Sequence, residues 1–242
     1  MFDESQFARW FRDGVREEGD PIPAATVVLV RDASDGLETL MLRKNSKLAF
    51  GGMWVFPGGR IDDADRDGAV DVVSAARRAA VREAAEEADL VVDEPTLAWI
   101  SHWLPPGLAP RRYATWFFVA PAPEGAVTID GGEIHDSAWM APADALARRD
   151  AGEIELAPPT WMTLHHLAEF ATVAELLEDA RIREPRAYQT QIARCADGIA
   201  AVWSGDAAYG NDDPDAPGPR HRLWMVDSGW RLERTIDRPA QT

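Results

Sequence analysis

The stretch that decides the fold opens with Phe56-Pro57-Gly58-Gly59-Arg60 and closes with Val81-Arg82-Glu83-Ala84-Ala85-Glu86-Glu87-Ala88-Asp89-Leu90. From residue 72 onward it is rich in Ala, Glu and Arg and has no Gly or Pro before residue 95, which predicts a helix. At roughly 100° per residue, Glu83, Glu86 and Glu87 fall within one arc of about 100°. One or two turns earlier, the same arc carries Val72, Val73, Ala76, Ala79 and Ala80. The glutamates are therefore expected on a helix edge that faces the rest of the protein.

This placement of three carboxylates needs a positive partner. Carboxylates spaced at i, i+3 and i+4 repel one another, and only an open face lets water screen them. A hard divalent cation such as Mg²⁺ takes carboxylate oxygens and shares its other positions with water and substrate phosphates. The helix alone leaves two readings open, a metal-binding edge and a solvated acidic face.

The glycine turn before the helix favours the metal-binding reading. Gly58 and Gly59 follow a strand-like run over residues 53–56. Paired glycines permit a positive φ and let the backbone approach a ligand or a neighbouring segment closely. Exposed N–H groups of such a loop, beside a carboxylate-bound cation, are suited to holding a diphosphate.

Together these residues resemble the Nudix box of the Nudix hydrolases, in which a Gly, five residues and a Glu precede Arg-Glu-apolar-x-Glu-Glu-x-Gly-apolar. Gly59 matches the first Gly, Leu90 the last apolar position, and residues 82–88 the helical core. The resemblance implies that Glu83, Glu86 and Glu87 bind Mg²⁺ or Mn²⁺ and that Arg82 supports them. It also implies an α/β/α sandwich around a mixed sheet.

The match has three departures. Asp65 occupies the first acidic position, sixteen residues separate it from Arg82 instead of seven, and Asp89 replaces the closing Gly. Asp tolerates the left-handed conformation that often ends a helix, so the last change is mild. The enlarged loop copies the first half of an EF-hand at Asp63-x-Asp65-x-Asp67-Gly68, but Ser74 stands where the twelfth-position Glu belongs. We therefore expect a polar surface loop here, and the role of Asp65 stays open.

Composition limits the substrate and the compartment. The 242 residues carry a net charge of −16 and 46% hydrophobic residues, enough for a full globular core. Such a surface repels nucleic-acid backbones, which disfavours a polynucleotide substrate, and a small anionic substrate would need local cations and a metal to bind. The single cysteine, Cys195, excludes an intramolecular disulfide. With no signal-peptide pattern and no apolar run near 18 residues, we expect a cytoplasmic protein without a membrane partner.

Strands and helices alternate in the remainder of the first 183 residues. We expect a short N-terminal helix within residues 2–12 and a hairpin of strands at 24–30 and 38–43. Further strands are predicted at 96–103, 111–119, 127–130 and before Trp139, and helices at 142–149 and 158–180 with a break near Thr172. Mixed strands and helices predict an α/β sandwich domain over residues 1–183.

The sequence changes character from about residue 184. Strands are predicted at 188–195 and 200–203, followed by a loop rich in Gly, Asp and Pro over 205–219. Residues 221–226 and 230–236 then read as a β-hairpin. We therefore expect residues 184–242 to form a small β-rich appendage, which could contribute to the pocket, to a cap or to a homodimer contact.

Several residues outside the box are candidates for the site. Arg43 lies just upstream of the glycine turn, with Lys44 and Lys47, and could face substrate phosphates; a solvated loop charge is the alternative. Arg111, Arg112 and Tyr113 suit phosphate and base or pantetheine contacts at the start of a strand. Glu133 precedes a strand, where many Nudix hydrolases place a further metal ligand or the general base.

The arrangement over about residues 22–180 is similar to the Nudix branch that includes the coenzyme A diphosphatases with an enlarged box loop. The residues that carry this likeness are Leu40-Met41-Leu42-Arg43, the glycine turn, Trp103-Leu104-Pro105-Pro106 and the strand from Arg111. The resemblance implies metal-dependent hydrolysis of a diphosphate linkage in a nucleoside diphosphate derivative, with CoA or acyl-CoA as one candidate. The rival hypothesis is a non-catalytic Nudix-like sensor that binds a nucleotide derivative.

Overall fold

The computed structural model describes residues 19–45, 51–107, 112–196, 198–211, 213–226 and 229–235. The chain divides into two compact units. The larger comprises Ile22–His102 and Thr115–Arg186, and the smaller comprises Met1–Pro21, Trp103–Ala114 and Ala187–Thr242. The expected N-terminal helix lies outside the described residues, and the expected boundary near residue 184 stays a prediction.

The larger unit is built on a sheet in the order β3-β2-β1-β6-β5, with β4 pairing with β1 and β7 with β2. The strands are β1 (Ile22–Ala33), β2 (Gly36–Lys44), β3 (Trp54–Val55), β4 (Gly58–Arg60), β5 (Ala98–Leu104), β6 (Tyr113–Pro121) and β7 (Ile134–Met140). β1 and β2 form the predicted hairpin, in which Ala33 pairs with Gly36. β5 runs on into the smaller unit, to which its last two residues belong.

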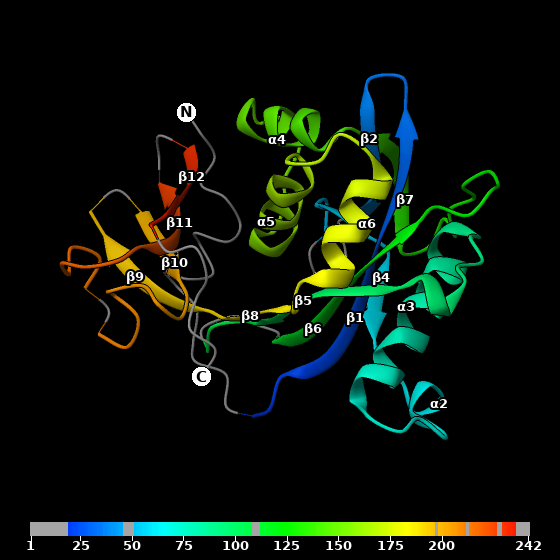
Figure 1. The fold of residues 1–242 in the computed structure, drawn as a ribbon, viewed down its shortest axis with the longest axis horizontal. Coiled ribbons are helices and arrows are strands. Elements are labelled where there is room, and N and C mark those ends of the chain that lie inside the picture. Colours follow the sequence, from blue (N-terminus) through cyan, green and yellow to red (C-terminus); the bar gives the residue numbers. More distant parts are fainter. Residues whose placement is uncertain are drawn as a thin grey trace. The chain divides into compact units, whose positions relative to one another are not determined.

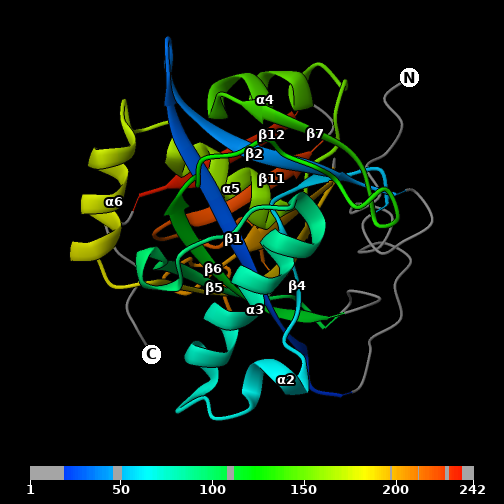
Figure 2. The ribbon, with the colours of Figure 1, turned by 90° about the vertical axis from the view of Figure 1, so that its right-hand side faces the viewer.

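Helices cover both faces of this sheet, which gives the predicted α/β/α sandwich. They are α2 (Asp63–Arg66), α3 (Val72–Ala88), the 3₁₀ turn η1 (Glu94–Thr96), α4 (Pro142–Asp150), α5 (Pro158–Leu167) and α6 (Val173–Ile182). In Figure 1, α3 lies on one side of β1 and α5 and α6 lie on the other; Figure 2 shows α3 in front of β1. Within the described part of the chain, no helix is both long and apolar enough to cross a membrane.

Local sequence explains where these helices begin and end. The predicted break near Thr172 is confirmed, because the Thr172 hydroxyl accepts the Glu175 N–H (3.3 Å) and the Glu175 carboxylate accepts the Thr172 N–H (3.3 Å). The expected strand at 127–130 is absent. Instead the Asp130 carboxylate accepts the N–H groups of Glu133 and Ile134, each at 2.9 Å, and closes a turn.

The helix α3 runs as the sequence predicts. Asp71 caps its start by accepting the Ser74 N–H at 2.7 Å, and Asp89 ends it with a φ of 57° in the left-handed region. Its buried face consists of small side chains, which allow close packing on the sheet: Ala75, Ala76, Ala79, Ala80, Ala84 and Ala88. Val72 was expected on this face but is 41% exposed; it is the first residue of the helix, directly after the N-cap Asp71.

The smaller unit contains a four-stranded antiparallel sheet in the order β12-β11-β10-β9. Its strands are β9 (Gln191–Cys195), β10 (Gly198–Val202), β11 (His221–Val226) and β12 (Gly229–Arg234). β11 and β12 form the predicted hairpin. The single strand expected at 188–195 is two, β8 (Arg186–Gln189) and β9, because the chain turns at Thr190, whose N–H donates to the Leu104 carbonyl at 2.9 Å.

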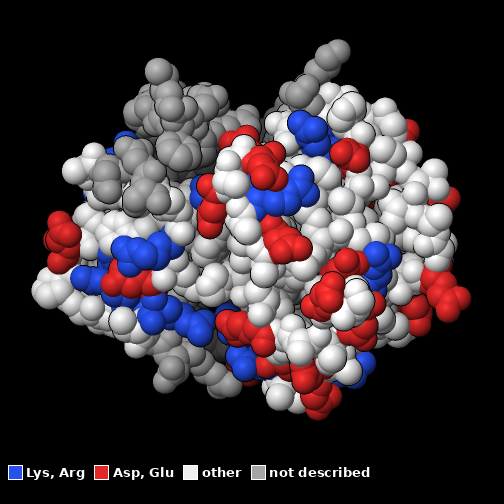
Figure 3. Space-filling view, turned by 90° about the horizontal axis from the view of Figure 1, so that it is seen from above, with Lys and Arg blue, Asp and Glu red and all other residues white. Residues whose placement is uncertain are grey.

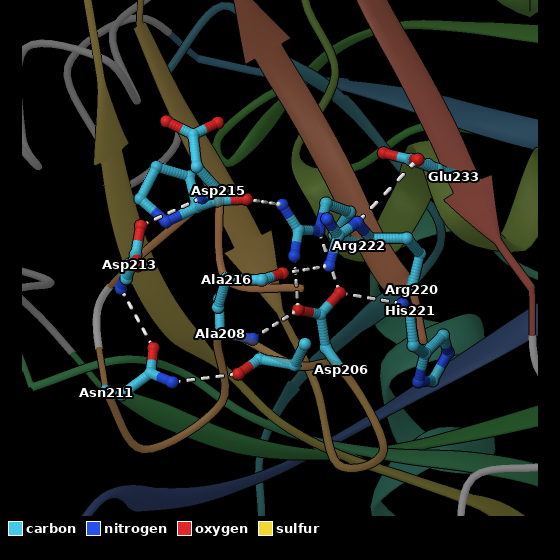
Figure 4. Close-up of polar contacts among 12 residues, drawn as sticks. Asp206, Ala208, Asn211, Asp213, Asp215, Ala216, Arg220, His221, Arg222 and Glu233 are labelled. Atoms are coloured by element: carbon cyan, nitrogen blue, oxygen red, sulfur yellow. Dashed lines mark hydrogen bonds and ion pairs between the residues drawn. The ribbon is translucent and has the colours of Figure 1, made fainter. Parts of the chain in front are cut away.

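The Gly-, Asp- and Pro-rich segment between β10 and β11 is ordered by a buried ion pair (Figure 4). The side chains of Asp206 and Arg222 are both 0% exposed and join through bonds of 2.8 and 2.5 Å. Asp206 also accepts the N–H groups of Ala208 (2.8 Å) and His221 (2.7 Å), and Arg222 donates to the Pro214 carbonyl at 2.6 Å. The pair therefore fixes both ends of this segment.

Candidate functional site

The glycine turn lies directly against β1 and α3. Gly58 and Gly59 form most of the short strand β4, which pairs with Thr26 and Ala25 of β1. A Cβ on Gly58 would collide with the backbone at Ala25 and Thr26, and a Cβ on Gly59 would collide with the carboxylate of Glu83. Neither glycine is among those with a positive φ, so close approach rather than backbone freedom requires them.

Glu87 is the most enclosed of the three glutamates on α3. It is 3% exposed, its Oε2 accepts the Gly58 N–H at 2.9 Å and its Oε1 accepts a hydrogen bond from Lys44 Nζ at 3.1 Å. Burial raises the pKa of the Glu87 carboxyl to about 7, and the Lys44 charge and the Gly58 N–H oppose this rise. A buried acid held by a backbone N–H and one cation is well placed to receive a second cation.

Arg82 joins the acidic residues of the site. Its Nη1 donates to Glu83 Oε1 at 2.8 Å and to Glu86 Oε2 at 2.9 Å. Its Nε and Nη2 bind Asp65 at 3.2 and 2.9 Å, and Nη2 also donates to the Arg60 carbonyl at 2.9 Å. The hydrogen bond to Asp65 is the largest cause of a raised pKa for Arg82. The guanidinium therefore orients Glu83 and Glu86 from a fixed position.

Asp65 corrects one expectation. The enlarged loop was expected to be a polar surface loop, but it contains the helix α2, in which Asp65 is 4% exposed. Its Oδ2 accepts the Asp62 N–H at 2.9 Å, in addition to the two bonds from Arg82. Asp65 therefore occupies the acidic position six residues after Gly59, and residues 67–71 join α2 to α3. The signal in the sequence was the family spacing from Gly59 to Asp65.

Glu133 is linked to the glutamates of α3 by Lys44, whose ammonium lies near both Glu133 and Glu87. Its Oε2 lies 3.6 Å from Lys44 Nζ, and its side chain is 62% exposed. The loop that carries it is fixed by Asn45, whose N–H donates to the Glu133 carbonyl at 2.8 Å and whose Nδ2 donates to the Gly132 carbonyl at 3.2 Å. Burial lowers the pKa of Lys44, but the charge of Glu87 and further carboxylates outweighs it and the pKa is raised.

The residues predicted to contact substrate phosphates or the base are not held against the glutamates of α3 by any contact described above. Arg43 lies exposed on β2, where it pairs with Trp54 and Asp136. Arg111 lies outside the described residues. Arg112 and Tyr113 belong to the smaller unit, and Arg112 Nη1 donates to a carbonyl of that unit at 2.8 Å. Their predicted contacts with substrate stay predictions.

Carboxylate oxygens from Glu83, Glu86 and Glu87 are the ligands that hard divalent cations prefer. Among the residues that the structure describes, no group of three His, Cys, Asp or Glu is already assembled as a metal site. Each of the three carboxylates instead holds a protein donor, Arg82 for Glu83 and Glu86, and Lys44 and Gly58 for Glu87. The donor set thus fits a divalent cation, which would exchange for these bonds.

Comparison with known proteins agrees with this geometry. Residues 20–161, more than half of the chain, match the NUDIX domain. The acyl-coenzyme A diphosphatase NUDT19 of Gallus gallus is 30% identical over 136 residues, and the match covers 52% of this chain but only 36% of that protein.

A solved structure shares the fold. A NUDIX hydrolase from Alicyclobacillus acidocaldarius superposes with a TM-score of 0.63 at 23% identity, over 67% of this chain and 97% of that one. The NUDIX domain of Shewanella oneidensis NrtR, solved with ADP ribose, is more distant, with a TM-score of 0.49 at 18% identity over 68% of this chain and 97% of that one. The domain match, the shared fold and the glutamates against the glycine turn lead to one conclusion: the chain belongs to the Nudix family.

Proposed function

We propose that this protein hydrolyses a diphosphate linkage in a nucleoside diphosphate derivative, with Mg²⁺ or Mn²⁺ bound by Glu83, Glu86 and Glu87. One observation carries the proposal: the carboxylates of Glu83 and Glu87 lie against the Gly58–Gly59 turn instead of extending into solvent. Glu86 is different, since its side chain is 59% exposed. Glu86 would therefore hold a cation from the solvent-exposed edge of α3.

The residues of the chain divide the work. The bound cation would neutralise charge on the phosphoryl oxygens and acidify a water molecule. Gly58 fixes one oxygen of Glu87, and Arg82 fixes Glu83 and Glu86. The proton of the attacking water would go to a carboxylate, either Glu83 or Glu133. Burial raises the pKa of the Glu83 carboxyl, which makes it a stronger base than an exposed glutamate.

CoA or acyl-CoA is the substrate class that we place first. Its support is the likeness to NUDT19, an acyl-coenzyme A diphosphatase, over 136 residues. The protein carries a net charge of −16, and in Figure 3 acidic side chains are spread over much of the surface drawn, with basic side chains in smaller groups. An anionic substrate therefore needs local cations, for which Arg43, Arg111 and Arg112 are our candidates.

The experiment is an assay of product formation, in which the two phosphomonoesters are separated and quantified, on acyl-CoA, CoA, ADP-ribose, NADH and nucleotide sugars. Each substrate is tested with Mg²⁺, with Mn²⁺ and with a chelator. We expect cleavage of at least one diphosphate that the chelator abolishes. Cleavage that persists in the presence of the chelator would contradict the proposed metal dependence. Binding of these compounds without any cleavage would favour a non-catalytic binding module.

That alternative is a non-catalytic module that binds a nucleotide derivative. The observation in its favour is that all three glutamates already hold protein donors. Against it stands the retention of every glutamate together with Arg82, because a module that only binds has less need of the full set.

A further inference from the structure

Lys44 stands at the centre of the site, although the Nudix motif does not include it. It lies at the end of β2 with its side chain 15% exposed. The chain has 25 Lys and Arg residues, of which only Lys44 and Lys47 are lysines. A lysine at this position is therefore a departure from the residue that this protein uses almost everywhere else for positive charge.

The Lys44 ammonium touches two carboxylates from separate elements. It lies 3.1 Å from Glu87 Oε1 on α3 and 3.6 Å from Glu133 Oε2 on the loop before β7. Both acids belong to the group proposed here to bind the metal or to accept a proton. In the described part of the chain, no other Lys or Arg forms an ion pair with either carboxylate.

The backbone fixes Lys44 on both sides. Its N–H donates to the Met53 carbonyl at 3.0 Å and its carbonyl accepts the Gly52 N–H at 2.9 Å. The next residue, Asn45, anchors the Glu133 loop through its own backbone and side chain. The backbone around Lys44 therefore fixes the position of the ammonium, and Asn45 fixes the loop that carries Glu133, one of its two carboxylate partners.

The chemistry of an ammonium group matches this position. It is a compact point charge with rotatable donors on a flexible stem, whereas a guanidinium forms planar, paired bonds that are harder to release. A divalent cation entering beside Glu87 would compete with the ammonium for the same oxygens and would be repelled by it.

We propose that Lys44 is the internal counter-cation of the site: its ammonium neutralises Glu87 and Glu133 when no metal is present, and it gives up these carboxylates when a divalent cation binds. This inference rests on the proposed function, since it takes Glu87 as a metal ligand. Lys44 is thus a positioning residue that lowers the affinity for free metal and keeps the buried acid charged and oriented.

Direct metal titration tests this without any substrate. Free Mn²⁺ is measured by electron paramagnetic resonance during titration of the wild type, Lys44→Met, Lys44→Arg and a charge-matched control, Arg31→Met. Arg31 pairs with Glu38 at the far end of β1 and touches none of the site carboxylates. We expect Lys44→Met to bind Mn²⁺ roughly tenfold more tightly, on the order expected for removing one nearby charge. Lys44→Arg should bind Mn²⁺ more weakly than the wild type, because its paired bonds are harder to release, and Arg31→Met should match the wild type. Unchanged or weaker binding by Lys44→Met would overturn the inference.

A second measurement avoids mutation altogether. Reductive methylation of the wild type, read by mass spectrometry, reports labelling at Lys44 with Lys47 as the reference within the same molecule. Addition of Mg²⁺ should increase labelling at Lys44 relative to Lys47, because the ammonium leaves its two carboxylates. Equal labelling with and without Mg²⁺ would contradict the exchange.

Glu87→Gln separates the two proposals. Weaker Mn²⁺ binding by Glu87→Gln, together with no gain for Lys44→Met, would leave the metal site intact and overturn only the role of Lys44. Equal Mn²⁺ binding by Glu87→Gln and the wild type would place the metal elsewhere, and both the proposed function and this inference would fail.

Discussion

At the scale of single residues, the site is a set of acids held by opposing donors. Arg82 binds three carboxylates and one carbonyl, and Lys44 binds two carboxylates. Because every acid has a donor, the site is electrostatically stable without a metal, and the metal must exchange for bonds that already exist. The exact set of partners decides which substitutions change activity and which change stability.

The substitution Asp65→Asn should reduce both the turnover of the enzyme and its stability. The amide keeps the size of the side chain but removes the charge that anchors Arg82 through bonds of 3.2 and 2.9 Å. We expect turnover to fall by about one order of magnitude and stability by about 1–3 kcal/mol, as for a charge-assisted bond at a buried group. Denaturant unfolding and steady-state kinetics measure the two effects. Asp67→Asn, on the exposed end of the same loop, is the control.

At the scale of elements, the glycine turn and α3 act together. The alanine face of α3 packs on the sheet closely enough that the Glu83 side chain fills the space over Gly59. Gly58 meets backbone atoms instead. The two glycines are adjacent in sequence but respond to different neighbours, and this difference can be measured.

Gly59→Ala should fold and lose activity, whereas Gly58→Ala should lose stability. The added methyl at 59 displaces the flexible end of Glu83, but the methyl at 58 meets the backbone of β1, which cannot move away without breaking strand pairing. We expect the free energy of unfolding of Gly59→Ala to lie within about 1 kcal/mol of the wild-type value. That of Gly58→Ala should be lower by about 2 kcal/mol or more. Two variants of equal stability and equal activity would show that the turn does not contact the site as described.

Asp89→Gly should stabilise the protein. Asp89 ends α3 with a φ of 57°, a conformation that costs a non-glycine residue about 1 kcal/mol. We expect a gain of about 0.5–1 kcal/mol in denaturant unfolding, with kcat unchanged, since the Asp89 side chain is exposed. Asp89→Ala keeps the steric cost and serves as the comparison; stabilisation by alanine instead would refute this explanation.

Sequence patterns predicted elements better than they predicted partners. The start of α3, the β1–β2 hairpin and the break at Thr172 follow from local signals: helix formers without Gly, a turn between apolar runs, and a capping threonine. The burial of Asp65 did not follow, because it depends on Arg82, seventeen positions further along the chain. The position of Lys44 between Glu87 and Glu133 joins three distant parts of the chain, which no local pattern reports.

At the scale of the whole molecule, the chain consists of two compact units, which differ in how their charged side chains are paired. The larger unit places its acids at the edge of an apolar core and gives each a donor. The smaller unit instead buries a complete ion pair, Asp206 with Arg222, under the segment that links β10 to β11. A buried pair costs desolvation, and its loss leaves an uncompensated charge.

Asp206→Ala should therefore destabilise the smaller unit by about 3–5 kcal/mol, because Arg222 would remain buried without its partner. The double variant Asp206→Leu with Arg222→Met removes both charges and should recover a part of this loss. Denaturant unfolding followed by tryptophan fluorescence measures it, since Trp203 and Trp224 lie in this unit. A double variant no more stable than Asp206→Ala would argue that the pair is not what orders the segment.

The measurement that tests the central claim most directly is the turnover of Glu87→Gln on a cleaved diphosphate, with Mg²⁺, at a fold verified by circular dichroism. Glu87 joins the helix, the glycine turn and Lys44, and the variant keeps its shape while removing its charge. The account predicts that turnover falls by two or more orders of magnitude, roughly the effect of losing a metal-binding carboxylate, with folding unchanged. Full metal-dependent activity in this variant would contradict it.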